Sequence, residues 1–391
     1  MDFTLTENQR ALQQLAHEFA ESEIRPVAHE LDRVADPHER FPWDVVEKAS
    51  RLGLRTLALP DEMGGAGADI LTLCLVGEEL AWGDLGVAVV FDQTWKISHL
   101  LERLANEEQR ARHLPAFLED HRFHLAVAMT EPSGGSDNVI PYDSPDAGVR
   151  TTAVREGDEW VVNGMKQFIS NGGIAKLYFV VLRTDTSVGV TQGLTYFMMT
   201  PDMEGFSIGR IHDKMGQRLS QNSELIFENC RVPDAERVTA VGGAHEARKT
   251  FVRGSNIEAA ATVLGTARAA YEEALEYARN RVQGGKPIIE HQAVGFMLAD
   301  CFVEYEAARR LLHYAAWTAG QPDLYDPKMG FLTKTFVSET AYRIATRALE
   351  VWGGMGYMTE APMEKYLRDA TSFLHSDGTN QAMRIRAMSF L

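Results

Sequence analysis

Cysteine is scarce in this 391-residue chain, which contains only Cys74, Cys230 and Cys301. The three residues form no Cys-x-x-Cys pair and lack the spacing typical of a zinc site. We therefore expect no disulfide framework and no metal site. A reducing compartment, the cytoplasm, is the expected location.

Long apolar runs and an excess of positive charge are also missing. No run approaches the ~20 apolar residues that a membrane helix needs, and the N-terminus does not resemble a signal peptide. Lys and Arg total 39 against 55 Asp and Glu, which gives a formal net charge of -16. Nucleic acid and anionic membranes are polyanions, so neither is expected as the main partner.

The sequence pattern divides the chain into three units, which we place at residues 1–122, 123–237 and 238–391. The first unit has helical signals, such as Thr6 with Gln9 three residues later as a capping box. A predicted helix over 71–82 ends at Gly83-Asp84. The length is sufficient for two or three packed units.

The middle unit is rich in short β-type segments bounded by turn residues. We predict strands at 124–129, 160–162, 178–182, 194–199 and 223–227, with a hairpin turn at Asn163-Gly164 because both residues tolerate positive φ. This pattern predicts an antiparallel β-barrel or sandwich.

Helical periodicity returns after about residue 238. Leu298, Cys301, Tyr305 and Leu312 fall on one face of a long predicted helix. The overall fold class is therefore α+β, with helices, a β unit and then a helical bundle.

Five groups of residues have the polar and glycine-rich character of ligand-binding segments. They are 129–137 (MTEPSGGSD), 163–172 (NGMKQFISNG), 214–218 (KMGQR), 281–292 (RVQGGKPIIEHQ), and 353–357 with 377–381 (GGMGY and DGTNQ). Individually, each can be a turn or a helix cap. The glycines from Gly353 are no dinucleotide fingerprint, because they follow a predicted helix rather than a strand.

In this order and at these distances, the segments resemble the acyl-CoA dehydrogenase family of flavoproteins over essentially the whole chain. The resemblance implies an N-terminal helical domain, a central antiparallel β-barrel and a C-terminal four-helix bundle. It also implies FAD bound non-covalently between barrel and bundle. A homotetramer is expected, in which the nucleotide end of FAD reaches a neighbouring subunit.

The resemblance assigns roles residue by residue. Asp377 matches the catalytic carboxylate, and Gly378 beside it is expected near the substrate. The expected FAD contacts are Met129, Thr130, Ser136, Phe168, Ser170, Arg281, Gln292, Gly353, Gly354, Thr379 and Gln381, with Ser136 also meeting the thioester arm of the substrate.

The implied reaction is α,β-dehydrogenation of an acyl-CoA or acyl-carrier thioester. Asp377 would remove the α proton while the β hydride passes to the flavin. A carboxylate in a dry pocket is a competent base because burial raises its pKa. Electron-transfer flavoprotein is the expected acceptor.

The sequence departs from the family at the base, where glutamate is common and aspartate is one methylene shorter. Asp92, Ser255 and Asn256 are further candidates for substrate contact, and Asp92 is the alternative base. Ser255 with Glu258 also reads as a capping box.

The aspartate at 377, the serine at 255 and the stretch 265–275 also resemble nitroalkane oxidase, which shares the fold. We therefore expect an atypical substrate, such as a cyclic acyl group. A flavin oxidase and a non-catalytic subunit of a hetero-oligomeric dehydrogenase are the alternative functions.

Overall fold

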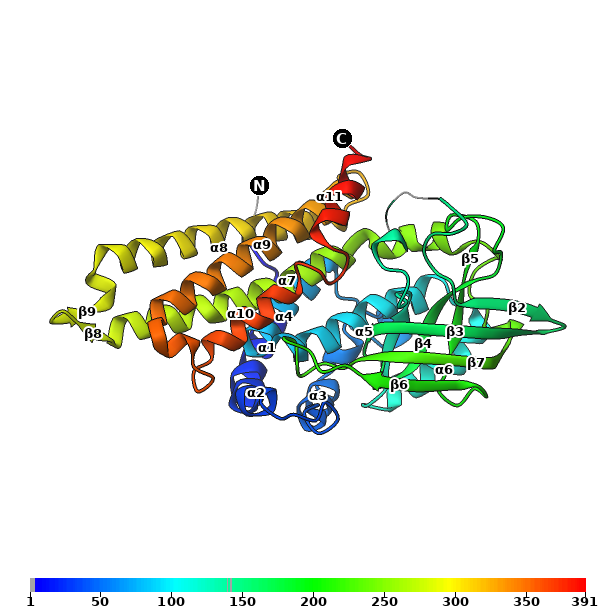
Figure 1. Cartoon of the computed structure of the whole chain (residues 1–391), viewed down its shortest axis with the longest axis horizontal. Helices are drawn as coiled ribbons and strands as arrows, with labels where there is room; N and C mark the ends of the chain where they lie inside the picture. The colour runs from blue at the N-terminus through cyan, green and yellow to red at the C-terminus, as the bar shows by residue number, and fades with distance from the viewer. Residues whose placement is uncertain (1–3, 139, 141–142) are drawn as a thin grey trace.

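The computed structural model describes residues 4–138, 140 and 143–391, with the side chains of 250–252 outside this description. Helices of the first unit and long helices of the last unit pack together beside a β-sheet (Figure 1). The order of helices, strands and helices agrees with the sequence prediction.

Six α-helices lie in the described part of the first unit, residues 4–122, and polar side chains fix where several of them begin. Thr6 and Gln9 form the predicted capping box at the start of the first helix, and Asp84 accepts a hydrogen bond from the N–H of Val87 at 2.9 Å. Asp84 therefore separates two buried helices. The helices are α1 (Glu7–Phe19), α2 (Arg25–Asp32), α3 (Trp43–Arg51), α4 (Ile70–Gly83), α5 (Leu85–Arg103) and α6 (Glu107–Glu119).

The middle unit is one seven-stranded sheet in the order β1-β4-β2-β3-β7-β6, with β5 also paired to β4. The prediction of a purely antiparallel unit is wrong, because β1 runs parallel to β4. A long connection follows β1, and such a connection permits parallel pairing, which a short hairpin does not. The strands are β1 (His124–Ala128), β2 (Thr152–Glu156), β3 (Glu159–Ser170), β4 (Ala175–Arg183), β5 (Leu194–Met199), β6 (Phe206–Ile211) and β7 (Asn222–Pro233).

The predicted hairpin turn at Asn163-Gly164 is also wrong, because both residues lie inside β3. The β2–β3 hairpin instead turns between Glu156 and Glu159, which pair with each other. Gly164 has φ +139° at an irregularity in the β3–β7 register, and a Cβ there would lie 2.8 Å from Thr151 Cα. This glycine therefore permits a bulge and a close backbone approach rather than a turn.

The third unit is built around α7 (Ala244–Asn280), a helix of 37 residues. Because α7 continues through Ser255 without a break, the interpretation of Ser255 and Glu258 as a capping box is wrong. The face of α8 that was predicted to be apolar is confirmed, with Leu298, Cys301, Tyr305 and Leu312 all buried. The remaining elements are β8 (Val282–Gln283), β9 (Lys286–Pro287), α8 (Gln292–Ala319), α9 (Pro327–Trp352), α10 (Met363–Ser372) and α11 (Asn380–Met388).

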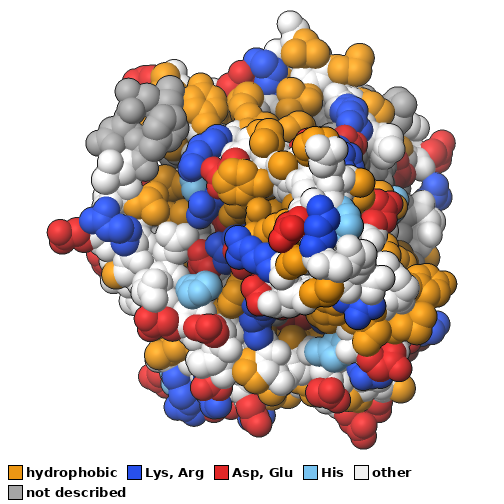
Figure 2. All heavy atoms as spheres, turned by 90° about the vertical axis from the view of Figure 1, so that its left-hand side faces the viewer, with side chains coloured by type: hydrophobic (Ala, Val, Ile, Leu, Met, Phe, Trp, Pro, Cys, Tyr) orange, Lys and Arg blue, Asp and Glu red, His pale blue; other side chains and the backbone are white. Residues whose placement is uncertain are grey.

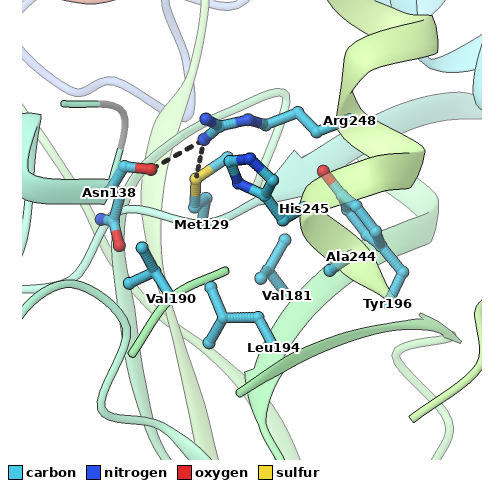
Figure 3. Close-up of a pocket in the computed structure, with 9 residues that line it drawn as sticks. All are labelled: Met129, Asn138, Val181, Val190, Leu194, Tyr196, Ala244, His245 and Arg248. Atoms are coloured by element: carbon cyan, nitrogen blue, oxygen red, sulfur yellow. Dashed lines mark hydrogen bonds between the residues drawn. The ribbon is translucent and has the colours of Figure 1, made fainter. Parts of the chain in front are cut away.

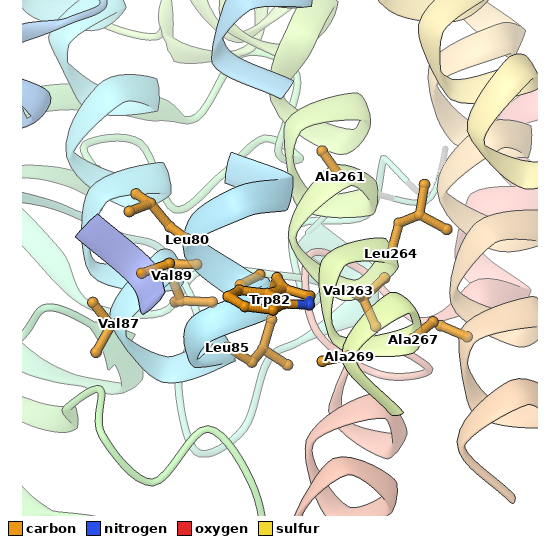
Figure 4. Close-up of a cluster of buried hydrophobic side chains, with 14 of the residues drawn as sticks. Leu80, Trp82, Leu85, Val87, Val89, Ala261, Val263, Leu264, Ala267 and Ala269 are labelled. Carbon is orange, nitrogen blue, oxygen red and sulfur yellow. The ribbon is translucent and has the colours of Figure 1, made fainter. Parts of the chain in front are cut away.

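One hydrophobic core joins the first and third units. Figure 4 shows Trp82 of α4 and Leu85 of α5 directed toward α7, with Ala269 of α7 beside them. Burying large apolar side chains contributes roughly 1.5–3 kcal/mol each. The core therefore fixes α5 and α7 relative to each other, and these two helices carry the buried charged residues described below.

Within residues 4–138, 140 and 143–391, no helix combines the length and apolar character needed to cross a membrane. Over the same residues, no group of histidine, cysteine and acidic side chains is arranged to hold a metal ion.

Candidate functional site

Asp377 lies in the short connection between α10 and α11, in a left-handed backbone conformation with φ +52°. Left-handed conformations are uncommon for residues other than glycine and persist where the surrounding contacts impose them. Gly378 follows with φ +86°, and a Cβ on Gly378 would lie 2.3 Å from Met383 Cε. The turn therefore requires glycine at 378, and it fixes the direction of the Asp377 backbone.

Two side chains from neighbouring helices hold this turn by its carbonyl groups. The Asn256 side-chain amide of α7 donates to the Asp377 carbonyl oxygen at 3.0 Å. The Lys334 ammonium of α9 donates to the Gly378 carbonyl oxygen at 2.8 Å and to Asn380 Oδ1 at 2.9 Å. The two contacts anchor the strained turn to α7 and α9.

The Asp377 carboxylate meets a buried ion pair on α5. Lys96 Nζ lies 2.6 Å from Asp92 Oδ2 and 3.4 Å from Asp377 Oδ2. The side chains of Lys96 and Asp92 are each 1% exposed, whereas that of Asp377 is 24% exposed. Asp377 is thus the member of this group whose side chain is open to solvent.

Burial dominates the electrostatics of the group. It raises the pKa of Asp92 to about 7 despite the neighbouring ammonium, and the charges of Asp377 and Glu258 raise it further. Burial opposes the charge of Lys96, but Asp377 and Asp92 together bring the pKa of Lys96 above its ordinary value. Burial also raises the pKa of Glu258 and lowers the pKa of Lys334 to about 8.

A second group forms where β1 and β3 end side by side. The Gln167 N–H donates to the Thr130 carbonyl oxygen at 2.8 Å, which joins the segment after β1 to β3. Asn222 donates from its side chain to the Phe168 carbonyl at 3.0 Å and to Ser170 Oγ at 3.1 Å. The Phe168 ring is 55% exposed.

The Met129 side chain lines a narrow cavity between the sheet and the start of α7 (Figure 3). Arg248 of α7 reaches over this cavity, with its guanidinium 3.8 Å from the Met129 sulfur and 2.7 Å from the Asn138 carbonyl oxygen. Asp377 is not among the residues that line the cavity. Ser136 begins a short 3-10 turn, Ser136–Asn138, in the connection between β1 and β2.

The remaining predicted FAD contacts divide between two places. Thr379 caps α11 by accepting from the Ala382 N–H at 3.2 Å, and Gln381 follows on the exposed side of the same turn. Arg281 directly after α7, Gln292 at the start of α8, and Gly353 and Gly354 directly after α9 are all exposed.

The C-terminal ends of α7 and α9 lie together. Tyr277, one turn before Arg281, stacks on Trp352, which directly precedes Gly353, with ring centroids 4.2 Å apart. Arg281 follows Asn256 by 25 residues, or about 37 Å of helix. A single chain therefore does not bring the Arg281 and Gly353 group to Asp377.

Sequence reasoning placed Asp92, Asn256 and Asp377 near one site, and the structure brings them together. It missed Lys96, Lys334 and Glu258. A signal was present, since Asp92 and Lys96 stand four residues apart, which is the spacing of an ion pair on one face of a helix. Glu258 likewise stands in an alanine-rich stretch of α7.

Comparison with known proteins covers the whole chain. Models of the acyl-CoA dehydrogenase N-terminal, middle and C-terminal domains match residues 6–121, 126–230 and 243–390. The short-chain specific acyl-CoA dehydrogenase of Clostridium acetobutylicum is 33% identical over 98% of both chains.

Two solved structures illustrate the similarity in fold. Butyryl-CoA dehydrogenase from Megasphaera elsdenii is 32% identical, with a TM-score of 0.91 over 100% of this chain and 99% of that one. A chain in a structure of the electron transferring flavoprotein of Acidaminococcus fermentans is 35% identical, with a TM-score of 0.90 over 99% and 98% of the two chains.

Proposed function

Because this chain belongs to the acyl-CoA dehydrogenase family of FAD-dependent enzymes, we propose that it oxidises an acyl thioester between its α and β carbons, with Asp377 as the base. The observation that carries this proposal is the strained turn at Asp377. The chain holds a partly exposed carboxylate there in a fixed position, by contacts from α5, α7 and α9.

The chemistry assigned to Asp377 is removal of a proton from the carbon next to the thioester carbonyl. That C–H bond is a weak acid, so the base must be placed accurately, and a misplacement of ~1 Å can cost ~10²-fold in rate. The contacts from Asn256 and Lys334 to the turn supply this placement.

The residues at the ends of β1 and β3 suit the flavin ring. Phe168 offers an exposed aromatic face, and Ser170 and the backbone around Thr130 offer polar groups beside it. Bound FAD supplies the acceptor for two electrons. The protein's part is to orient the ring against the substrate and to exclude water from the base.

We further propose that the nucleotide part of FAD is bound by a neighbouring subunit of a homotetramer. The separation of Arg281 and Gly353 from Asp377 within one chain supports this arrangement. Figure 2 views the end of the molecule that carries β8 and β9 and shows hydrophobic side chains spread between charged ones. The exposed apolar residues of α8 are Phe296, Phe302, Val303, Tyr314 and Trp317.

The carrier is coenzyme A or an acyl carrier protein. The electrons leave to an electron-transfer flavoprotein, and the similarity to a chain in the structure of the electron transferring flavoprotein of Acidaminococcus fermentans supports this acceptor. The units 1–122, 123–237 and 238–391 act as the three domains. The enzyme works in the cytoplasm, in accord with three free, buried cysteines.

The test is anaerobic spectroscopy of the flavin while the purified enzyme is mixed with linear, branched and cyclic acyl-CoA esters and with nitroalkanes. Bleaching by an acyl-CoA ester supports the proposal. Bleaching by nitroalkanes alone would replace it with the oxidase, and the absence of bound flavin would favour a non-catalytic subunit.

The base is tested separately with Asp377 variants that retain FAD. We expect Asp377→Ala and Asp377→Asn to lose rapid flavin reduction and Asp377→Glu to keep a measurable rate. Unchanged reduction in Asp377→Ala would transfer the role of base to Asp92.

A further inference from the structure

Buried acceptor oxygens without hydrogen-bond partners gather around the turn at Asp377. Three such atoms are Asp92 Oδ1, Asn256 Oδ1 and Glu258 Oε2, on residues that are 1%, 3% and 2% exposed. Buried polar atoms are nearly always paired, and leaving one unpaired destabilises the folded protein. Three unpaired acceptors in one region therefore call for an explanation.

The three residues belong to the same neighbourhood as the base. Asn256 donates to the Asp377 carbonyl oxygen, and Asp92 shares Lys96 with the Asp377 carboxylate. Glu258 is close enough for its charge to act on both Asp92 and Lys96. An acyl group positioned for attack by Asp377 would lie beside these oxygens.

The nearby cations are already engaged. Lys96 donates to Asp92 and Asp377, and Lys334 donates to Gly378 and Asn380. His99 and Arg103, whose charges also act on Glu258, both pair with Glu102. The region therefore has unpaired hydrogen-bond acceptors, whereas its charged donors already have hydrogen-bond or ion-pair partners.

The charges of the region also favour a positively charged ligand, because acids outnumber the nearby cations. Asp92, Glu258 and Asp377 are three acids, and the ammonium groups of Lys96 and Lys334 are the two cations, among the residues that the structure describes, that contact the turn or its carboxylate. An apolar acyl chain would leave the acceptors unpaired, and an acidic chain would add like charge. A group with N–H donors and a positive charge would pair the acceptor oxygens and balance the negative charge.

We propose that the acyl group oxidised at Asp377 carries an amine, which is bound by Asp92, Asn256 and Glu258. This inference rests on the proposed thioester oxidation and specifies its substrate class. The amine donates hydrogen bonds to the three acceptors and brings the reacting carbon to the Asp377 carboxylate.

The test compares amine-bearing thioesters with isosteres in which a methyl group replaces the amine. Two pairs vary the position of the amine, namely 2-aminobutyryl-CoA with 2-methylbutyryl-CoA and 5-aminopentanoyl-CoA with hexanoyl-CoA. Stopped-flow flavin reduction gives the rate divided by the dissociation constant for each ester. We expect the amine to be preferred by about tenfold or more in at least one pair, since a hydrogen bond to a charged group typically contributes that much.

Several outcomes would overturn the inference. If both isosteres reacted as well as their amines, the thioester reaction would stand and the amine recognition would fail. Faster reduction by glutaryl-CoA than by any amine would show that the Lys96 ammonium selects an acid instead. If no thioester reduced the flavin, the proposed function itself would fail, and the inference would fall with it.

Variants at Glu258 connect the preference to the acceptors. We expect Glu258→Leu to reduce the preference for the amine over its isostere, measured as the ratio of their rates divided by their dissociation constants, by about tenfold. Glu258→Gln keeps an acceptor oxygen without the charge, so its preference should lie between those of the wild type and Glu258→Leu. Glu246→Gln, also on α7, is the matched control, because the Glu246 side chain is exposed and pairs with Lys249. An unchanged ratio in Glu258→Leu with FAD bound would contradict the assignment. If Glu258→Leu does not fold, Asp92→Asn tests the same ratio.

Discussion

Replacing Lys96 with methionine removes the only cation within hydrogen-bonding distance of the buried Asp92 carboxylate among the residues described by the structure. We expect Lys96→Met to lower the stability of the protein, and to lower it more as the pH rises above 7. The reason is that the Asp92 carboxyl must then either stay protonated or carry an unpaired charge in the protein interior.

The size of the effect follows from the pKa of Asp92, which is about 7 when Lys96 is present. This value lies above the unfolded one of roughly 3.9, so the carboxyl stabilises the folded protein at low pH, and this contribution is lost as the pH rises through 7. In the wild type the loss of stability stops near pH 7, because the Asp92 carboxyl then ionises and its carboxylate pairs with Lys96. In Lys96→Met the carboxyl stays protonated, so the loss continues at about 1.4 kcal/mol per pH unit.

Between pH 7 and pH 9 the variant should therefore lose about 3 kcal/mol relative to the wild type. An unfolding entropy of roughly 2 cal/mol/K per residue gives roughly 0.8 kcal/mol/K for 391 residues. The expected difference in melting temperature grows by about 3 °C over this pH range.

Thermal unfolding followed by circular dichroism at pH 6, 7, 8 and 9 measures this difference. The double variant Asp92→Asn with Lys96→Met is the control, because it removes the titrating carboxyl and should show no growth with pH. A decrease in melting temperature that is the same at every pH would refute the assignment of Asp92 as the partner of Lys96.

Three further predictions concern the glycine of the β3 bulge and the contacts to the turn at Asp377. Gly164→Ala should lower the free energy of unfolding by about 1–3 kcal/mol, because φ is +139° and a Cβ would lie 2.8 Å from the backbone of Thr151. Gly320→Ala is the control in the same denaturation assay and should change this free energy little, because the added Cβ would lie 3.5 Å from Trp317 O, an ordinary contact. Asn256→Ala should slow flavin reduction about tenfold or more, because the Asp377 carbonyl loses its donor. If stopped-flow rates stayed at the wild-type level, Asn256 would not position the turn. Lys334→Met should also slow flavin reduction, with FAD still bound, and an undiminished rate would show that the turn holds its shape without this ammonium.

The local features of the fold were predictable where neighbouring residues decide them. The capping box of Thr6 and Gln9, the break at Gly83-Asp84 and the apolar face of α8 all depend on residues close in sequence. The hairpin at Asn163-Gly164 was wrong because β7 pairs with β3 there, and this distant strand makes the glycine a bulge. Ser255 was misread for the same reason, since packing against α4 and α9 continues α7 through it.

The candidate site also combines features that neighbouring residues decide with contacts that only distant segments make. Its glycine and aspartate at 377–378 stand out in the sequence, because few other residue types accept the backbone conformation that the turn uses. The residues that surround Asp377 come from α5, α7 and α9, and they are separated from it by 281, 121 and 43 positions for Lys96, Asn256 and Lys334. No local pattern links them.

The sequence alone determined the order of helices and strands, the family to which the chain is related and the residue expected to act as the base. These depend on short segments whose residue types carry their own conformational and chemical preferences. The tertiary structure alone decided the parallel pairing of β1 with β4, the distance between Arg281 and Asp377, and the gathering of unpaired oxygens around the turn at Asp377. These depend on which distant surfaces pack together, since burial and pairing arise between segments and not within them.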